Sequence, residues 1–457
     1  MPVKVISTNQ NAETIVAASA RISTTKGSAL EIFNRQNPID KDRDLIKKVL
    51  QLGHNSLIEH AIFNLAFEDV SAFVEQFMIE FRLASFTVKS RRYVEFTDMG
   101  YNIPNFDKYD AEFKSKYINH MDMLFGLYGD MVNEGIPKED ARFILPYGFK
   151  SNFYCTVNAR EATLIIKRAL NSRYNEIIEI GNSLLEQLNS IYPSIINKET
   201  IYKEGIKKIN KDSIKKEFDN ISYENIECEL CSYTQNPEEI IAIAEMLNET
   251  VMSYREMKTL VSNNETYKME LINRAVKKEK KRELEQITFT FNISNISLAG
   301  LTHLVRHRMQ SIIIPDLLTT FDKMKFIMPD TIRQNKKILE KYKNALEQHK
   351  QIISFLVDNN IDESDLIYLC LSGNLIDVMT TMNYRELLHF LELRSCFRAQ
   401  WEIQELSLSI IRLLKDNFKI LGKFAGPSCY TGGICREGKF SCGKAKEIKN
   451  LIDGVDE

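Results

Sequence analysis

The sequence predicts an α/β (α+β) fold made of two tandem copies of one domain, each with a mixed sheet and long helices. Three observations support this prediction. The chain has 457 residues, more than a single hydrophobic core usually organises. It matches itself without gaps after a shift of 226 residues, a period far too long for a solenoid repeat. Segments with strand and helix periodicity alternate in both halves, and helix is in excess.

The shift places residues of the same type on one another in both halves. The pairs include Thr8 with Thr234, Glu13 with Glu239, Glu59 with Glu285, Phe63 with Phe289, Ser71 with Ser297, Arg82 with Arg308 and Ser85 with Ser311. We therefore expect a first domain over 1–197, a linker over 198–226, a second domain over 227–422 and a Cys/Gly-rich tail over 423–457. The linker is rich in Lys, Glu and Asn, so a short solvated helix is an equal alternative there.

Each half is expected to begin with a short strand and a helix. The strands are predicted at Lys4–Ser7 and Glu229–Tyr233, and the helices at Ala12–Ala20 and Pro237–Met246. The strongest strand signal is the alternation of Ile287, Phe289, Phe291 and Ile293 with polar residues. Further helices are expected over Ser297–Arg308, Arg160–Tyr192 and Tyr384–Phe418.

The composition excludes several classes of protein. The formal net charge is −2, so there is no electrostatic case for nucleic-acid binding. No apolar run is long enough for a membrane span, and no secretory signal is visible, so neither membrane nor export is expected. The 8 cysteines are scattered along a long chain, which favours free thiols in a reducing cytoplasm.

The densest chemical feature is Arg306-His307-Arg308, expected at a helix end after the alternating strand. Two guanidinium groups offer forked donors that match phosphate oxygens, and a histidine between them can donate to a carbonyl or a ring nitrogen. A solvated basic helix end is the alternative, and the spacing alone favours it.

Several motifs taken together resemble the flavin-dependent thymidylate synthases. That family carries R-H-R-x-x-S-x-N-E-x-S-x-R-Y, preceded by H-x-S-x-x-E-H. The first half has the second motif whole, from His54 to His60, and the S-x-R-Y end at Ser90, Arg92 and Tyr93. The second half has the R-H-R itself with Ser311, and family-like segments from Asn383 to Phe390 and from Arg394 to Ile403.

The resemblance implies an enzyme that binds FAD and dUMP. Such enzymes transfer a methylene group from methylenetetrahydrofolate and reduce it with electrons from NADPH, giving dTMP. They use no cysteine nucleophile, because arginines activate the uracil electrostatically. They are tetramers whose sites draw on several subunits. For this chain the resemblance implies a homodimer equivalent to that tetramer, with small-molecule partners only.

The resemblance also assigns residues. The flavin side would include Arg306, His307, Arg308, Ser311, Asn383, Arg385 and His389, with His54, Ser56 and Glu59. The nucleotide side would include Arg82, Ser90, Arg92 and Arg142. The catalytic arginines would be Arg168 and Arg394.

The two halves depart from the family pattern at different places. Glu80-Phe81 replaces R-H in the first half, and the N-E pair is lost in both, at Val88 and Ile314. The flavin-side motif thus survives in the second half and the nucleotide-side arginines mainly in the first. We expect each half to provide one wall of a composite site.

Structural roles remain open for several of these residues. In the alternative interpretation His54 and His60 are satisfied structural histidines at the entrance to a buried strand. Arg142 then caps a helix or pairs with Glu139 or Asp140, and Phe81 fills core space. The tail brings Cys429, Cys435 and Cys442 into a glycine-rich loop, which is typical of zinc or an iron–sulfur cluster, though either needs a fourth ligand such as Cys396. Free thiols are the alternative for the tail.

Three functions are compatible with the sequence. The first is a tandem flavin-dependent thymidylate synthase. The second is a diverged relative that binds flavin and acts on another pyrimidine. The third is a non-catalytic binding or assembly protein on the same fold.

Overall fold

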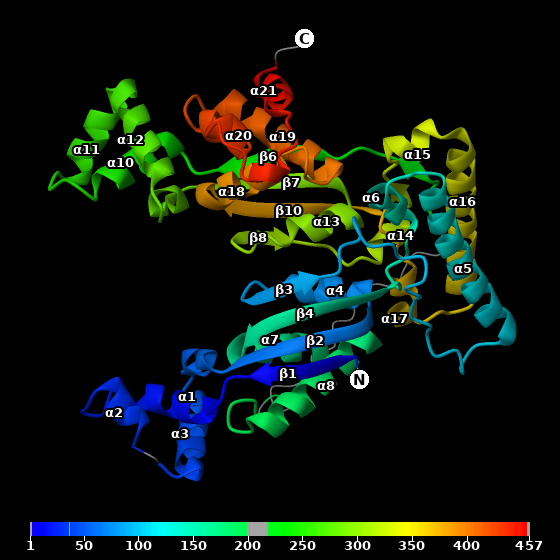
Figure 1. Cartoon of the computed structure of the whole chain (residues 1–457), viewed down its shortest axis with the longest axis horizontal. Helices are drawn as coiled ribbons and strands as arrows, with labels where there is room; N and C mark the ends of the chain where they lie inside the picture. Colours follow the sequence, from blue (N-terminus) through cyan, green and yellow to red (C-terminus); the bar gives the residue numbers. More distant parts are fainter. Residues whose placement is uncertain (1, 36, 199–200, 202–217, 455–457) are drawn as a thin grey trace. The chain divides into compact units, whose positions relative to one another are not determined.

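The computed structural model describes residues 2–35, 37–198, 201 and 218–454 (Figure 1). The chain forms two compact units. Unit 1 comprises Met1–Asn220, Phe321–Lys323 and Pro329–Ser372, and unit 2 comprises Ile221–Thr320, Met324–Met328 and Gly373–Glu457. Part of the second repeat therefore packs within unit 1. The domain limits expected from the sequence concern the repeats and stay predictions, and most of the expected linker lies outside the described residues.

Each unit contains one four-stranded sheet, and the two sheets have the same strand order. Unit 1 has β1 (Val3–Thr8), β2 (Ile62–Ser71), β4 (Lys150–Asn158) and β3 (Ala84–Val88), in that order across the sheet. Unit 2 has β6 (Glu227–Tyr233), β7 (Thr288–Ser297), β10 (Leu375–Asn383) and β8 (Gln310–Ile313). The tandem repeat and the fold class are confirmed.

One detail of the sheets differs from the expectation of a mixed sheet. Both four-stranded sheets are antiparallel at every pairing. A parallel pairing joins two short strands of unit 2, β5 (Ser222–Tyr223) and β9 (Lys325–Phe326). Antiparallel sheets commonly pack one face on the core and leave the other face more accessible, and successive residues of each strand alternate between the two faces.

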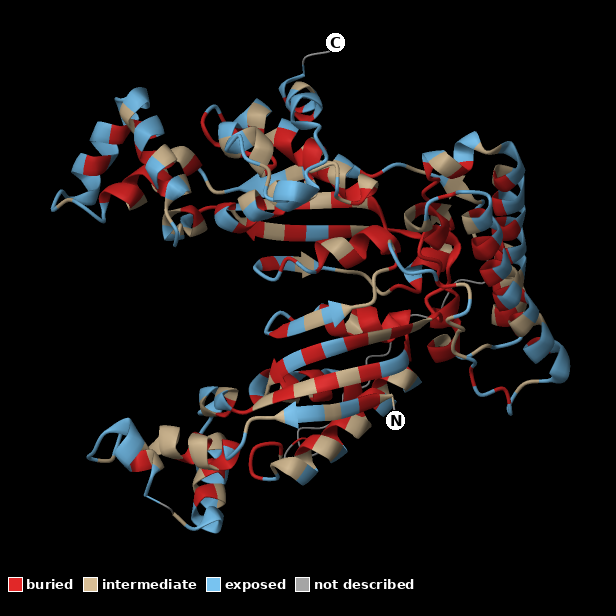
Figure 2. Ribbon diagram, viewed as in Figure 1, coloured by how far each residue is buried: buried red, intermediate tan, exposed pale blue. Residues whose placement is uncertain are grey.

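The predicted alternation in β7 is confirmed. Phe289, Phe291 and Ile293 are fully buried, whereas Thr288 is exposed. The change of burial from residue to residue is visible along the strands in Figure 2. Side chains with a period of two thus place one face of the strand in the core.

The helices described for the first repeat recur in the same order in the second repeat, which has α14 and α15 in addition. In the first repeat they are α1 (Ala12–Arg21), α2 (Ala29–Phe33), α3 (Ile39–Gln51), η1 (Asn55–His60), α4 (Ala72–Ile79), α5 (Ala111–Asn133), α6 (Lys138–Ala141), η2 (Arg142–Ile144), α7 (Ala159–Leu170) and α8 (Asn175–Ile191). In the second repeat they are α10 (Pro237–Met246), α11 (Tyr254–Ser262), α12 (Glu265–Lys277), η3 (Arg282–Gln286), α13 (Leu298–Leu304), α14 (Thr319–Lys323), α15 (Asp330–Gln334), α16 (Lys336–Asp358), α17 (Glu363–Leu366), η4 (Ile367–Leu369), α18 (Tyr384–Arg394) and α19 (Trp401–Asn417). The tail adds η5 (Leu421–Phe424), α20 (Ser428–Thr431), η6 (Gly438–Phe440) and α21 (Ala445–Asp453).

Each of the two long helices expected near the repeat ends is in fact a pair. The first breaks between α7 and α8, where the Asn171 side chain donates to the carbonyl of Lys167 at 2.8 Å. The second breaks after α18, where the Ser395 hydroxyl donates to the carbonyl of Leu391 at 2.6 Å. Short polar side chains compete with the helix for backbone groups, which explains both breaks.

A helix from each repeat packs in unit 1. α5 and α16, both 23 residues long, lie against one another. His120 and His349 meet within this packing, with Nε2 of His120 2.9 Å from Nδ1 of His349. Both imidazoles are buried. The pairing of equivalent helices explains why unit 1 takes in residues 329–372.

None of the helices in the described ranges combines the length and the apolar character needed to cross a bilayer.

Candidate active site

The Arg-His-Arg segment of unit 2 lies in a turn between α13 and β8. The helix ends at Leu304, whose carbonyl accepts a hydrogen bond of 2.5 Å from the Gln310 side chain. The helix predicted over Ser297–Arg308 is therefore too long, because Gln310 takes an orphan carbonyl at its end. Arg306 and Arg308 are exposed, whereas His307 between them is 4% exposed.

His307 is held from both ring nitrogens. Its Nδ1 lies 3.2 Å from Oε1 of Glu386, and its Nε2 accepts a hydrogen bond of 3.0 Å from Nε of Arg394. Because the arginine can only donate, Nε2 carries no proton, and the proton of the neutral ring is on Nδ1. Burial lowers the pKa of His307, and the Glu386 hydrogen bond only partly opposes this. A neutral histidine thus connects a carboxylate to a guanidinium group.

A hollow of about 420 Å³ adjoins the start of α18. It brings together three residues predicted for the flavin side, Asn383, Arg385 and His389. Its other lining residues are Glu279, Lys281, Glu285, Met309, Glu386, Leu388 and Glu392. The His389 ring centre lies 5.9 Å from that of His307, so the hollow and the Arg-His-Arg turn are neighbours.

The role of Glu386 was missed by the sequence interpretation. Asn383 begins α18 and its side chain accepts a hydrogen bond of 2.9 Å from the Glu386 backbone. An Asn three residues before a Glu is an N-terminal helix signal. This spacing places the Glu386 side chain in the first turn, and it could have been found from the sequence.

Both repeats contain the same ion pair beside this region. Arg385 pairs with Glu285 in unit 2, and Arg160 pairs with Glu59 in unit 1 at 2.6 Å. Glu59, which was predicted to line the flavin side, pairs here with an arginine at the start of α7. The repeated pair indicates a contact that belongs to the domain architecture.

In unit 1 the place equivalent to His307 is occupied by Phe81. Its ring is buried, and the Arg168 guanidinium lies 5.4 Å from the ring centre. Glu161 stands three residues after the helix-capping Asn158, as Glu386 does after Asn383, but it accepts a hydrogen bond of 3.2 Å from the Leu83 backbone. Phe81 therefore fills core space, as the structural alternative predicted. Arg168 stacks on Phe81, whereas Arg394 donates a hydrogen bond to His307.

Arg92 and Arg142, predicted for the nucleotide side, both bind Glu139. Arg92 pairs with its carboxylate, and Nε of Arg142 donates to its backbone carbonyl at 3.0 Å. The Ser90 hydroxyl accepts a hydrogen bond of 3.3 Å from the Arg92 backbone. Three of the four predicted nucleotide-side residues are thus connected through short contacts around Glu139, and Arg82 is exposed in the turn before β3.

Other predicted residues lie at accessible positions. His54 and Ser56 are exposed at η1. Ser311 is exposed on β8, opposite Thr381 of β10. Their roles stay predictions.

The cysteines of the tail do not form a recognisable metal site. Within residues 2–35, 37–198, 201 and 218–454, no group of three or more His, Cys, Asp or Glu side chains is arranged to hold a metal ion. Cys429 does lie close enough to Cys396, Cys435 and Cys442 for electrostatic interaction, although Cys442 is exposed. The structure gives no support to the metal predicted at Cys429, Cys435 and Cys442, which stays a prediction.

The geometry of unit 2 defines a polar site built from one turn and one helix start, with arginine, histidine and amide donors. Comparison with known proteins gives the chain a family. A model of the family described as thymidylate synthase complementing protein matches residues 4–194 and again 229–418.

Individual relatives match about one repeat. The chain is 32% identical over 226 residues to a flavin-dependent thymidylate synthase of Geobacter sulfurreducens, covering 49% of this chain and 96% of that protein. It is 30% identical over 244 residues to one of Clostridium tetani, covering 50% and 96%. Against one of Pyrococcus furiosus it is 33% identical over 186 residues, covering 40% and 75%. The chain belongs to the flavin-dependent thymidylate synthase family and contains the family domain twice.

Proposed function

We propose that this chain makes dTMP from dUMP by reductive methylation, using FAD, methylenetetrahydrofolate and NADPH. The observation that carries the proposal is the linkage of Glu386, His307 and Arg394 beside the hollow with Asn383 and His389. Family membership supplies the reaction class, and this linkage supplies a polar site in the repeat that keeps Arg-His-Arg.

The residues around the hollow have the donor chemistry that a flavin needs. Arg306 and Arg308 would hold the phosphates, since guanidinium groups match phosphate oxygens. Asn383 and His389 would hydrogen-bond the ring system. Four carboxylates also line the hollow, those of Glu279, Glu285, Glu386 and Glu392. Glu285 pairs with Arg385, Glu392 pairs with Arg436, and Glu386 contacts His307. When bound, the flavin supplies the electrons for the reduction.

The protein would position charge on the nucleotide. Arg394 would stabilise the negative charge that develops on the uracil, and His307 would hold its guanidinium in one orientation. Arg168 is the second predicted catalytic arginine. Arg92 and Arg142 would bind the nucleotide phosphate, with Arg92 exchanging Glu139 for the substrate.

The test is anaerobic reconstitution with FAD, followed by an assay of dTMP formation with all co-substrates. We expect turnover that is lost in Arg308→Ala. An exposed arginine on another face, Arg255 of α11, provides the matched control, and Arg255→Ala should keep full activity. Protein that binds flavin and dUMP but forms no dTMP would contradict the proposal.

One observation favours a second candidate, a relative acting on a different pyrimidine. The N-E pair of the family motif is lost in both repeats, at Val88 and Ile314, whose side chains cannot accept a hydrogen bond from a nucleotide base. A screen of pyrimidine nucleotides against the FAD-loaded protein distinguishes the two, since the first candidate requires dUMP to bind most tightly.

We further propose a homodimer in the cytoplasm. Light scattering should give twice the mass of the chain in solution, and a monomer mass would contradict this part of the proposal.

A further inference from the structure

The tail that follows the second repeat packs against α19 of unit 2. It lies beyond the match to the family, which ends at residue 418. Ile448 and Ile452 of α21 are buried. Lys415 of α19 donates to the carbonyl of Ile452 at 2.9 Å and binds Asp453 at 3.0 Å. The tail is therefore fixed to the body of unit 2 through α21.

One arginine of the tail reaches the hollow at the start of α18. Nη1 of Arg436 lies 3.2 Å from Oε2 of Glu392, and Glu392 lines that hollow. The backbone N–H of Arg436 donates to the Ser428 hydroxyl at 3.2 Å, which fixes the main chain from which the arginine extends. Nearby in the tail, Lys444 lies 5.4 Å from the ring centre of Phe397, just after α18. The tail thus adds a cation to the edge of the hollow.

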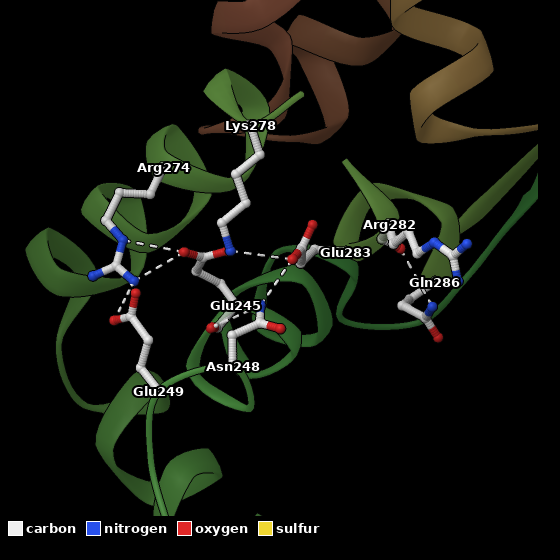
Figure 3. A network of polar contacts seen from close by, with 8 residues as sticks. All are labelled: Glu245, Asn248, Glu249, Arg274, Lys278, Arg282, Glu283 and Gln286. Carbon is white, nitrogen blue, oxygen red and sulfur yellow. Dashed lines mark hydrogen bonds and ion pairs between the residues drawn. The ribbon is translucent and has the colours of Figure 1, made fainter. Parts of the chain in front are cut away.

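Arg436 is accessible to a ligand, unlike the cations of a charge network elsewhere in unit 2. In that network Arg274 and Lys278 each bind two carboxylates around the fully buried Glu245 (Figure 3). The Arg436 side chain is 55% exposed, and its contact with Glu392 is made by Nη1. A guanidinium group has five N–H donors, so donors remain for a second anion.

The pair of Glu392 and Arg436 is particular to the repeat that keeps Arg-His-Arg. The helix-capping residues Asn158 and Asn383 align α7 with α18, and Lys167 then stands at the position of Glu392. Under the 226-residue shift the tail falls opposite the linker, where Asn210 stands opposite Arg436. Neither member of the pair therefore has a counterpart of the same type in the first repeat.

The charges around the hollow indicate what an arginine at its edge can do. Four carboxylates line it, whereas its lining cations are Lys281 and Arg385. The two phosphates of a flavin dinucleotide are negatively charged, so an excess of carboxylates opposes their binding. A guanidinium group neutralises a carboxylate and also offers forked donors to phosphate oxygens.

We propose that Arg436 is a phosphate-binding residue of the flavin site, supplied by the tail. Its guanidinium group neutralises Glu392 and donates to the phosphate oxygens of FAD, beside Arg306 and Arg308. The inference rests on the proposed function, because it takes FAD to bind in this hollow. It goes further in making the tail responsible for part of the preference for FAD over a flavin without phosphates.

Fluorescence titration of the full chain with FAD and with riboflavin tests the proposal. Riboflavin has the same ring system and no phosphate. We expect Arg436→Gln to weaken FAD binding about five- to tenfold in about 50 mM NaCl and to leave riboflavin binding unchanged. The loss should shrink to about twofold in about 0.5 M NaCl, because salt screens exposed charges. Lys439→Gln, at an exposed position of the same loop, is the matched control and should keep the FAD affinity.

A double variant separates loss of charge from loss of structure. Glu392→Gln combined with Arg436→Gln removes the carboxylate as well, so it should recover part of the FAD affinity that Arg436→Gln loses. Unchanged FAD affinity in Arg436→Gln, or an equal loss for riboflavin, would overturn this inference and leave the proposed function intact. No FAD binding by the unchanged chain would overturn both, so the two failures are distinguishable.

Discussion

The two repeats share their strand order but differ at the central residue of the Arg-His-Arg motif. Phe81 in unit 1 and His307 in unit 2 both follow a short helix and are both buried. The phenylalanine packs beneath Arg168, whereas the histidine connects Glu386 with Arg394. The difference shows that duplication kept the packing of the domain in both copies and kept the polar linkage in one.

Both repeats contain an equivalent hydrogen-bonded pair of a serine and a glutamate. Ser71 caps α4 and binds Glu176, and Ser297 caps α13 and binds Glu402. Each serine donates to a carboxylate on a later helix of its own unit and accepts a hydrogen bond from the first turn. Because loss of either partner would leave a buried polar group unpaired, these pairs fix the geometry of both copies.

The largest effect is expected from His307→Phe, which gives unit 2 the residue of unit 1. Glu386 and Arg394 would each lose a hydrogen bond, and Arg394 would lose its fixed orientation. Activity should fall about 10³-fold, as is typical when one preorganised group is removed. The assay is dTMP formation with FAD-loaded protein. Phe81→His is the reciprocal change, and activity lost equally in both variants would contradict the difference between the repeats.

The second expected effect concerns the histidine pair between α5 and α16. Burial lowers the pKa of His120 to about 4, and burial lowers that of His349 well below its usual value, with His120 adding to the effect. Unfolding would let both take up protons below about pH 6.5. Stability is therefore full above pH 6.5 and falls as the pH drops towards 4, by about 3 kcal/mol for His120 alone.

Denaturant unfolding between pH 7.5 and 4.5 measures this dependence. The double variant with His120→Leu and His349→Leu removes both titrating groups and should flatten the profile relative to the unchanged chain. A profile of the same slope in the double variant would show that other groups cause the acid sensitivity.

A third prediction concerns Gly300, which lies beside the Ser297–Glu402 pair of unit 2. A Cβ at Gly300 would lie 2.7 Å from Oε2 of Glu402, whereas the first repeat has Val74 at this position. Gly300→Ala should therefore destabilise the protein by about 1–3 kcal/mol. Gly126→Ala, in α5 with no atom within 4 Å of its Cβ, should stabilise it by about 1 kcal/mol. Thermal melting of both variants checks the contrast, and a stable Gly300→Ala would show that Glu402 can move.

Local signals in the sequence predicted many of the strands and helices. The alternation in β7 and the helices at Ala12 and Pro237 are confirmed, because they depend on periodicities of two and 3.6 residues. The breaks after Leu170 and Arg394 were missed, because apolar periodicity continues on both sides of each break. The apolar periodicity also gives no sign that α7 and α8 pack closely as a hairpin. A Cβ at Gly181 would lie 2.8 Å from Cβ of Ala169.

The site was predictable only in part, for a physical reason. Motif letters placed His307 and Arg394 in one site, but the hydrogen bond between them joins residues 87 positions apart. The binding of Arg92 and Arg142 to Glu139 likewise depends on tertiary packing. Sequence spacing identifies which groups are available, whereas only the fold shows which of them already bind one another.

The smallest effect is expected from the ion pair that both repeats share. Glu59 and Arg160 are 39% and 53% exposed, and Glu285 and Arg385 are 31% and 46% exposed. Exposed pairs of this kind contribute about 0–1 kcal/mol, so Glu59→Gln and Glu285→Gln should each change stability by less than about 1 kcal/mol. FAD affinity should distinguish the two variants, since Arg385 lines the hollow beside His307, in the unit that contains the linkage of Glu386, His307 and Arg394. FAD affinity that falls in Glu285→Gln but not in Glu59→Gln would locate the flavin in unit 2, and equal losses would contradict that placement.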